Sequence, residues 1–290
     1  MLEGLTCTSH WLDSHTSSTL EPPRKAPTKD AIIEVMAKLY HIGFGLEDLG
    51  DHPPTLAILS GDPSRAALIA HTRLHQSKAL SENRGLNSYL GYLPNGRPVI
   101  SATSGMGAPS LSIVVNELVQ LGIRTIIRVG TSGSIQEEVR PGSVVISKAA
   151  LCRQGAANDI APPEYPASAD PFLTVALVEA AQRMGIEYAL GITASVDTFY
   201  EGQERTGSAN PYLLRALQGI TEEYRSLRVL NYEMEAGTLF KMGNVYGFAA
   251  ACICGIIAQR TKAEQPLLEA KDLAVQRAID VALEVAARFA

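Results

Sequence analysis

An arginine and a run of small polar residues stand together in the segment 124–133. Arg128 lies within residues 125–129, a β-branched run typical of a strand buried on both faces. A buried arginine without a counter-charge is very costly, so Arg128 needs a carboxylate or an anionic ligand. We expect residues 130–133, Gly-Thr-Ser-Gly, to form a loop at the end of that strand. Backbone N–H groups and hydroxyls in such a loop can bind anion oxygens, so the pattern indicates an oxyanion site.

Polar side chains recur at the ends of other predicted strands. Each alone has a simpler interpretation: Arg65 and Arg205 could be solvated arginines in helical turns, and residues 233–235 an exposed first helical turn. Because the carboxyl ends of strands in one sheet face the same crevice, we expect the groups to converge there. Several arginines beside backbone amides suit a phosphate dianion, since arginine presents forked donors. The groups are Gly61 with Arg65, Arg128 with Thr131, Gln203 with Arg205, Glu233 with Glu235, and Arg260.

Missing motifs and the net charge exclude several classes of function. There is no Walker A sequence and no Gly-x-Gly-x-x-Gly after a predicted strand, so neither ATP nor a dinucleotide is indicated. All six histidines lie at or before His75, which excludes a serine-hydrolase triad with a late histidine, and no HExxH zinc motif is present. The net charge of −5 argues against nucleic acid as a partner.

The apolar runs and the cysteines bear on the compartment. No apolar run reaches the roughly 18 residues needed to cross a bilayer, so we expect no membrane contact. The four cysteines show no metal-ligand spacing. We expect them to be reduced and mostly structural, which predicts a cytoplasmic protein.

Strand and helix patterns alternate from residue 55 onward. We therefore predict an α/β fold: a single-domain three-layer α/β/α sandwich with a central mixed β-sheet, over residues 30–290. Residues 1–29 are polar, lack periodicity and carry several prolines, so we expect a disordered extension. Strands are predicted at 55–59, 125–129, 143–149, 188–195, 229–232 and 248–257, with a hairpin of 89–93 and 98–102. Helices are predicted at 31–40, 109–121, 171–184 and 267–289. A further helix is predicted to begin after residue 235 and to end at about residue 245.

Five short motifs follow one another along the chain. They are Ser60-Gly61-Asp62-Pro63-Ser64-Arg65, Gly105-Met106-Gly107-Ala108-Pro109-Ser110, Arg128-Val129-Gly130-Thr131-Ser132-Gly133, Asp197-Thr198-Phe199-Tyr200-Glu201-Gly202-Gln203-Glu204-Arg205 and Tyr232-Glu233-Met234-Glu235. They resemble motifs of the uridine phosphorylases, within the larger nucleoside phosphorylase family, and the resemblance runs in order from about residue 41 to the C-terminus. It implies reversible cleavage of uridine by phosphate to uracil and ribose 1-phosphate, with deoxyuridine and thymidine as further candidate substrates.

The resemblance also implies a role for each site residue. Phosphate would be bound by the Gly61 backbone, Arg65, Arg128 and Thr131, with Arg84 contributed by the neighbouring subunit. Catalysis would rest on Arg128, Gln203, Arg205 and Glu235. The ribose would be held by Glu233, Met234 and Glu235, with His41 again reaching in from the neighbour. The base would lie against Phe199 and be bound at its edge by Gln203 and Arg205, with Arg260 behind them.

The same resemblance carries implications for cofactors and assembly. Phosphate would be a co-substrate, and no cofactor is expected. Relatives with a monovalent-cation site carry a glutamate after the arginine that matches Arg84, and this chain has Gly85 there, so no metal is expected. Sites shared between subunits imply a homodimer or a trimer of dimers.

Three alternatives remain open at the level of sequence. A purine nucleoside phosphorylase of the same fold would place an aspartate near Arg260, where this chain reads Gln259-Arg260-Thr261. A hydrolytic nucleosidase would not need Arg65, Arg84 and Arg128 together. A non-catalytic nucleoside-binding protein could use the same scaffold, and only turnover distinguishes it.

Overall fold

A computed structural model describes residues 38–261, 265–266 and 268–290, and these all belong to one compact unit. The boundary predicted at residues 29 and 30, and most of the helix predicted at 31–40, lie outside the described residues. The described end of that predicted helix, residues 38–40, is not helical.

Among the described residues, ten strands form one mixed sheet in the order β10-β9-β6-β7-β8-β5-β1-β4-β3-β2. β5 also pairs with β9, so β5, β9, β6, β7 and β8 close into a ring, while β1, β4, β3 and β2 extend from it as an open sheet. β5 is parallel to both β1 and β9 and antiparallel to β8. The strands are β1 (Leu56–Ser60), β2 (His75–Ser81), β3 (Ser88–Tyr92), β4 (Pro98–Thr103), β5 (Thr125–Ser134), β6 (Val144–Arg153), β7 (Tyr188–Val196), β8 (Val229–Glu233), β9 (Ala249–Gln259) and β10 (Gln265–Pro266).

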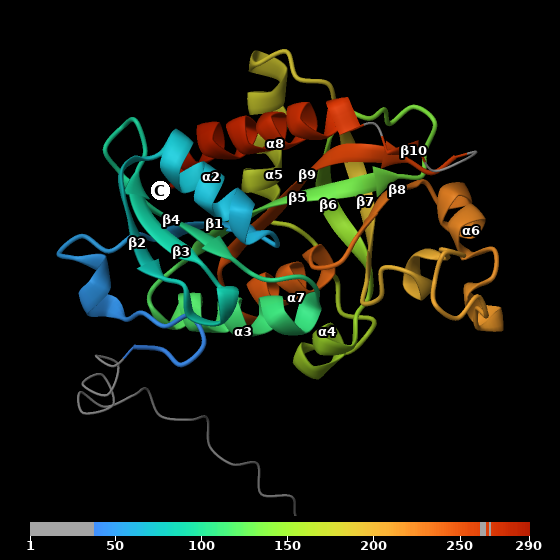
Figure 1. The fold of residues 1–290 in the computed structure, drawn as a ribbon, viewed down its shortest axis with the longest axis horizontal. Coiled ribbons are helices and arrows are strands. Elements are labelled where there is room, and N and C mark those ends of the chain that lie inside the picture. The colour runs from blue at the N-terminus through green and yellow to red at the C-terminus, as the bar shows by residue number, and fades with distance from the viewer. Residues whose placement is uncertain (1–37, 262–264, 267) are drawn as a thin grey trace, which may run out of the picture. The chain divides into compact units, whose positions relative to one another are not determined.

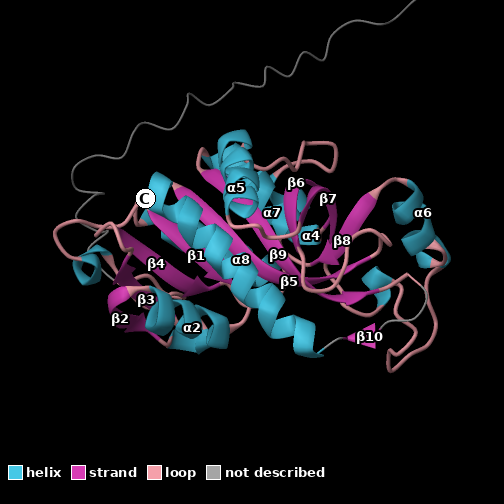
Figure 2. Cartoon of the chain, turned by 90° about the horizontal axis from the view of Figure 1, so that it is seen from above, coloured by secondary structure: helices cyan, strands magenta, loops and turns pink. Residues whose placement is uncertain are grey.

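Helices cover both faces of the sheet (Figures 1 and 2). α2, α5 and α8 lie on one face and α3, α4 and α7 on the other, so the predicted three-layer α/β/α arrangement around a mixed sheet is confirmed. The helices are α2 (Pro63–Arg73), α3 (Ala108–Gln120), α4 (Gly155–Ile160), α5 (Pro171–Arg183), α6 (Ile220–Ser226), α7 (Ala236–Tyr246) and α8 (Leu268–Phe289), with short 3-10 turns η2 (Leu46–Leu49), η3 (Asn83–Gly85), η4 (Glu201–Gln203) and η5 (Arg215–Leu217).

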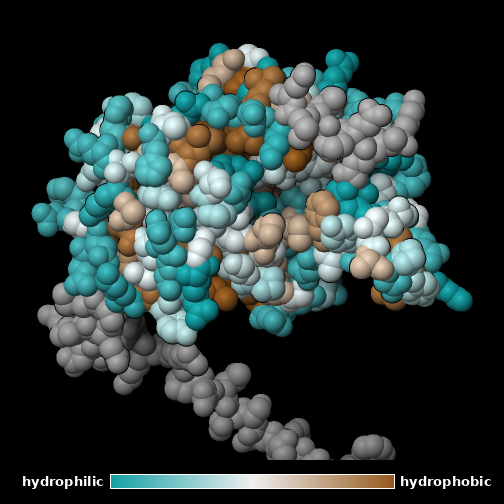
Figure 3. Space-filling model, viewed as in Figure 1, coloured by the Kyte–Doolittle hydropathy of each residue, from teal (hydrophilic) through white to brown (hydrophobic). Residues whose placement is uncertain are grey.

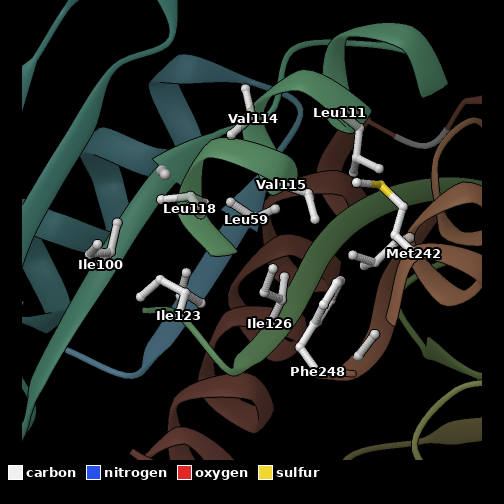
Figure 4. Packing of buried hydrophobic residues seen from close by; sticks show 14 of the residues in the cluster. Leu59, Ile100, Leu111, Val114, Val115, Leu118, Ile123, Ile126, Met242 and Phe248 are labelled. Atoms are coloured by element: carbon white, nitrogen blue, oxygen red, sulfur yellow. The ribbon is translucent and has the colours of Figure 1, made fainter. Parts of the chain in front are cut away.

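The α3 face of the sheet carries a continuous apolar core (Figure 4). Leu111, Val114, Val115 and Leu118 form one stripe of α3, within the helix predicted at 109–121, and all four are fully buried. They pack with residues of β1, β4, β5 and α7 in a single cluster. Because α3 is held along its length, its N-terminus is fixed beside the end of β1.

α5 shows the same division between core and surface on the opposite face. Leu173 and Leu177 are buried against the sheet, whereas Phe172 and Val175 are 76% and 56% exposed. Apolar residues interrupt the hydrophilic surface in the region where α5 and α8 lie (Figure 3). Among the described residues, no helix combines the length and apolar character needed to cross a bilayer.

The loop predicted at residues 130–133 is wrong, because β5 continues through Ser134. Residues 130–134 pair with β9, with a register shift between Ser132 and Gly133, and the last two also pair with β8. Glycine permits this close pairing: a Cβ on Gly130 would lie 2.8 Å from Cys254 Sγ. The small residues therefore allow a tightly packed strand at a position that the sequence pattern assigns to a turn.

Elements that the sequence did not predict include β2, α4 and α6. β2 is an edge strand whose side chains are mostly exposed or half-buried, so it lacks an alternating apolar pattern. α4 and α6 are only 6 and 7 residues long, too short to show a helical period. The antiparallel pairing of β3 with β4 confirms the predicted hairpin.

Gly255 of β9 lies against the backbone of α8. A Cβ at this position would lie 2.5 Å from the carbonyl oxygen of Ala274, a backbone atom that cannot rotate away. We expect Gly255→Ala to lower the free energy of unfolding by about 1–3 kcal/mol, the usual cost of overpacking. Urea denaturation measures this. Gly207→Ala is the matched control. Within the described part of the chain, no atom beyond its two chain neighbours lies within 4 Å of its Cβ position, so this change should alter stability little.

Candidate active site

Arg128 occupies the middle of β5 and is only 4% exposed. Its Nε donates to Glu233 Oε2 at 3.3 Å, and its Nη2 is paired with Glu235 Oε2. Burial alone would lower the pKa of Arg128, but the charges of Glu235 and Glu233 outweigh it and hold that pKa above its ordinary value. Arg128 is therefore a permanent cation whose orientation is fixed by two carboxylates.

Glu233 ends β8 and uses both carboxylate oxygens within the protein. Oε2 accepts from Arg128 Nε at 3.3 Å. The same oxygen accepts from the backbone N–H groups of Glu235 and Ala236, both at 2.8 Å. Oε1 accepts from the Ser195 hydroxyl. Desolvation is the main cause of its raised pKa, and the neighbouring Glu235 adds to it, whereas Arg128 opposes it. This carboxylate connects the end of β7, the start of α7 and Arg128.

Glu235 links Arg128 to α3. Its Oε1 accepts from the backbone N–H of Gly107 at 2.6 Å, immediately before the first residue of α3. Glu235 is 3% exposed, and the Met234 side chain beside it is half-buried. A carboxylate has about four lone-pair positions, so Glu235 retains capacity to accept from a hydroxyl.

Arg65 places a second cation near Arg128. It lies in the first turn of α2, where Asp62 caps the helix, and its Nη1 donates to the carbonyl of Val129 at 3.1 Å. Its Nη2 lies 3.5 Å from Thr131 Oγ1. Burial, and then the charge of Arg128, lower the pKa of Arg65. Two repelling cations held this close favour an anion between or beside them.

One guanidinium nitrogen of Arg128 points at the end of β1. Within the described part of the chain, Arg128 Nη1 is buried and has no hydrogen-bond partner. A Cβ on Gly61 would lie 3.9 Å from Arg128 Nη1 and 3.3 Å from the carbonyl oxygen of Gly105. Because Gly61 has no side chain, its backbone lies close to this Nη1 donor. An unsatisfied buried donor of a charged group is costly, and an anion oxygen would satisfy it.

The segment after β7 assembles the predicted base-binding residues. Gln203 is 4% exposed, and its Oε1 accepts from Arg205 Nε and Nη2 at 3.4 and 3.3 Å. The Arg205 guanidinium lies 4.0 Å from the centre of the Phe199 ring. Arg260 donates to the Gln203 carbonyl at 2.7 Å and lies over the Tyr232 ring. The four predicted residues thus form one connected group.

His41 and Arg84 form a separate cluster with Tyr40. His41 Nδ1 is 2.6 Å from Glu117 Oε1, and Arg84 Nη2 donates to the Tyr40 hydroxyl at 3.0 Å. Glu117 lies ten residues beyond Gly107, or about 15 Å along α3. This chain therefore holds His41 well away from its own Glu235.

His41 also lines an open pocket of about 560 Å³ on the α3 and α4 side. Ile113, Asn116 and Tyr246 are among its other lining residues, and none of the Arg128–Glu233–Glu235 group is. Among the described residues, no group of three or more His, Cys, Asp or Glu side chains is arranged to hold a metal ion.

Several residues that shape the site were not predicted. Ser195 and Gln154 carry no motif signal, although Gln154 is fully buried and bonds the Met234 carbonyl and Thr238. Glu117 did carry a signal, because a carboxylate near the apolar stripe of α3 needs a partner. It accepts from the backbone N–H groups of His41 and Ile42 as well as contacting the imidazole.

The chain belongs to the phosphorylase superfamily, whose family model matches residues 55–290. It is 44% identical to a uridine phosphorylase of Haemophilus influenzae over 212 residues, which cover 73% of this chain and 83% of that protein. It is 40% identical to the uridine phosphorylase of Escherichia coli over 251 residues, which cover 87% of this chain and 98% of that protein. A DeoD-type purine nucleoside phosphorylase of Mannheimia succiniciproducens is 32% identical over 79% of this chain and 91% of that protein.

Removing Arg128 leaves two buried carboxylates without their cation. We expect Arg128→Ala to lower the free energy of unfolding by about 3–5 kcal/mol, the range for breaking a buried ion pair from one side. Arg65→Ala is the comparison: among the described residues Arg65 bonds a carbonyl and a hydroxyl, so its loss should cost only about 1 kcal/mol. Urea unfolding of both variants measures the difference, and equal losses would contradict this account of Arg128.

Proposed function

We propose that this protein is a uridine phosphorylase, a pentosyltransferase that reversibly cleaves uridine with phosphate to give uracil and ribose 1-phosphate. The observation that carries the proposal is the unsatisfied Arg128 Nη1, which lies beside the Gly61 backbone near a second buried arginine. The identities of 44% and 40% to proteins named uridine phosphorylase support it. Deoxyuridine and thymidine are further candidate substrates.

In this proposal phosphate binds between β1 and β5. The Gly61 backbone, Arg65, Arg128 and Thr131 supply donors from one subunit, and Arg84 adds a cation from its neighbour. Phosphate is then the nucleophile and a co-substrate, so the reaction needs no covalent enzyme nucleophile, and we propose no cofactor. The protein acts by positioning and by electrostatic stabilisation.

The ribose lies over the residues that follow β8. Cleavage of the glycosidic bond develops positive charge on the sugar, which the negative charge of Glu235 stabilises. Glu235 accepts from the sugar hydroxyls, and Met234 packs beneath the ring. Glu233, whose oxygens already have protein donors, contributes by orienting Arg128 and the backbone of Glu235. His41 of a neighbouring subunit reaches the 5′-hydroxyl.

The uracil lies against Phe199 with its polar edge toward Gln203 and Arg205. Negative charge accumulates on the leaving base, and the Arg205 guanidinium stabilises it. Gln203 directs Oε1 to Arg205, which leaves its amide nitrogen to donate to a uracil carbonyl oxygen. Arg260 holds the backbone of this segment from behind.

A purine nucleoside phosphorylase is the second candidate, favoured by the 32% identity to one such enzyme. The residues after β9 weigh against it, because Arg260 and Thr261 stand where an aspartate would be needed. A cytoplasmic location stays a prediction from the cysteine content.

The first test is phosphate dependence. Because the arginine-lined site is proposed to bind the attacking phosphate, we expect uracil release from uridine in phosphate buffer and none in its absence. Inosine is run in parallel, and faster hypoxanthine release would favour the purine enzyme. Uracil release at the same rate without phosphate would indicate a hydrolytic nucleosidase. No base release from either nucleoside would indicate a binding protein.

We further propose a homodimer or a trimer of dimers with shared sites, since His41 and Arg84 lie together in a cluster away from Glu235 of their own chain. In a mixed dimer of Arg84→Ala and Arg65→Ala subunits, one site collects both defects and the other neither. We expect each variant alone to be nearly inactive, and subunit exchange to restore about a quarter of wild-type activity. Continued inactivity after confirmed exchange, or an active monomer in sedimentation, would contradict shared sites.

A further inference from the structure

Glu204 lies between Gln203 and Arg205 and has an unusual backbone conformation. It follows η4 with φ 52° and ψ 46°, in the left-handed region that non-glycine residues rarely adopt. This turn lets the side chains on either side of Glu204 meet, with Gln203 Oε1 accepting from Arg205. Such a conformation persists only where other contacts hold it.

The carboxylate of Glu204 supplies such contacts. Oε2 accepts from the backbone N–H of Thr221 at 2.9 Å, and Oε1 accepts from the backbone N–H of Gly219. These two groups lie at the start of α6, 15 and 17 residues further along the chain. One side chain therefore joins the segment after β7 to a distant element.

α6 is itself fixed to the sheet. Tyr224 of α6 is buried in one cluster with Tyr232 of β8, and their ring centres are 6.0 Å apart. The hydroxyls of Thr221 and Tyr232 are within hydrogen-bond distance of each other. Glu204 is thus connected through α6 to β8, the strand that leads into Glu233.

We propose that Glu204 is a positioning residue that holds Gln203 and Arg205 in the geometry that recognises the base. The inference rests on the proposed function, which assigns those two side chains to uracil. Glu204 acts through the backbone on both sides of it and does not touch the substrate. Other contacts also hold the segment: Arg260 donates to the Gln203 carbonyl, and the Gly155 N–H donates to Asp197. Both act on residues that precede Glu204.

A positioning role and a purely structural role differ in which substrate is affected. Loss of a purely structural link lowers the melting temperature. It also lowers the apparent kcat in proportion to the folded fraction, and it leaves both Michaelis constants unchanged. Loss of the positioning contact acts on the nucleoside alone, because the arginine site for phosphate is built on β1, β5 and α2. The Michaelis constants for uridine and phosphate therefore separate the two roles.

The experiment compares Glu204→Ala, Glu204→Gln and Glu204→Gly with Glu223→Gln, a matched control on the exposed side of α6. We expect Glu204→Ala to raise KM for uridine about tenfold while KM for phosphate changes less than about twofold. Glu204→Gln keeps one acceptor oxygen, so its KM for uridine should rise less than that of Glu204→Ala. Glu204→Gly removes the left-handed strain as well as the carboxylate, so it should resemble Glu204→Ala in KM. Glu223→Gln should match the wild type.

Amide hydrogen exchange of residues 197–206 in wild type and Glu204→Ala gives a second readout that does not depend on turnover. We expect faster exchange in the variant, most clearly at Arg205, whose N–H donates to the Tyr200 carbonyl. Unchanged exchange, an unchanged KM for uridine, or equal changes in both Michaelis constants would overturn the inference. A wild-type protein that fails to cleave uridine would overturn the proposed function instead, and exchange would still report on the Glu204 contacts.

Discussion

The buried ion pairs of Arg128 with Glu233 and Glu235 are the constraint on which the site depends. Three charges in a desolvated strand are stable only if each is paired and hydrogen-bonded, and the surrounding backbone supplies those bonds. Two of the three guanidinium nitrogens are bound by the carboxylates, so the third is directed at Gly61. The orientation of the cation is therefore a property of the fold and exists before any ligand arrives.

The same carboxylates bring together elements that share no sheet hydrogen bonds. Through Glu235 the N-terminus of α3 is tied to β5, and through Glu233 the end of β7 is tied to the start of α7. The proposed base-binding group is attached differently. The Glu204 side chain reaches from the loop to α6, and the Arg260 side chain reaches from the residue after β9 to the Gln203 carbonyl. The proposed phosphate site is thus built on strands and on α2, whereas the proposed base-binding site depends on loop contacts.

Much of the fold could be predicted from the sequence, because long apolar periods such as that of α3 and β-branched runs such as 125–129 are strong signals. The continuation of β5 through Gly130 could not be predicted, because small residues that favour turns also permit tight strand pairing. For the site, the sequence indicated that buried Arg128 needs a carboxylate or an anionic ligand. Glu233 and Glu235 were already candidate site residues. Ser195, Gln154 and Glu204 could not be predicted, because their roles arise from contacts across 42, 80 and 17 residues of chain.

The closed ring of β5, β9, β6, β7 and β8 has a consequence for the order in which the molecule is built. β5 ends at residue 134, but its neighbour β9 does not begin until residue 249, so a growing chain carries an unpaired β5 edge for more than a hundred residues of synthesis. Contacts this distant are slow to form, since the loop between them must be closed first. Unpaired strand edges also invite association with other chains. During its synthesis this protein is therefore most exposed to aggregation between the emergence of β5 and the docking of β9, and a nascent chain that stops short of β9 lacks one wall around Arg128.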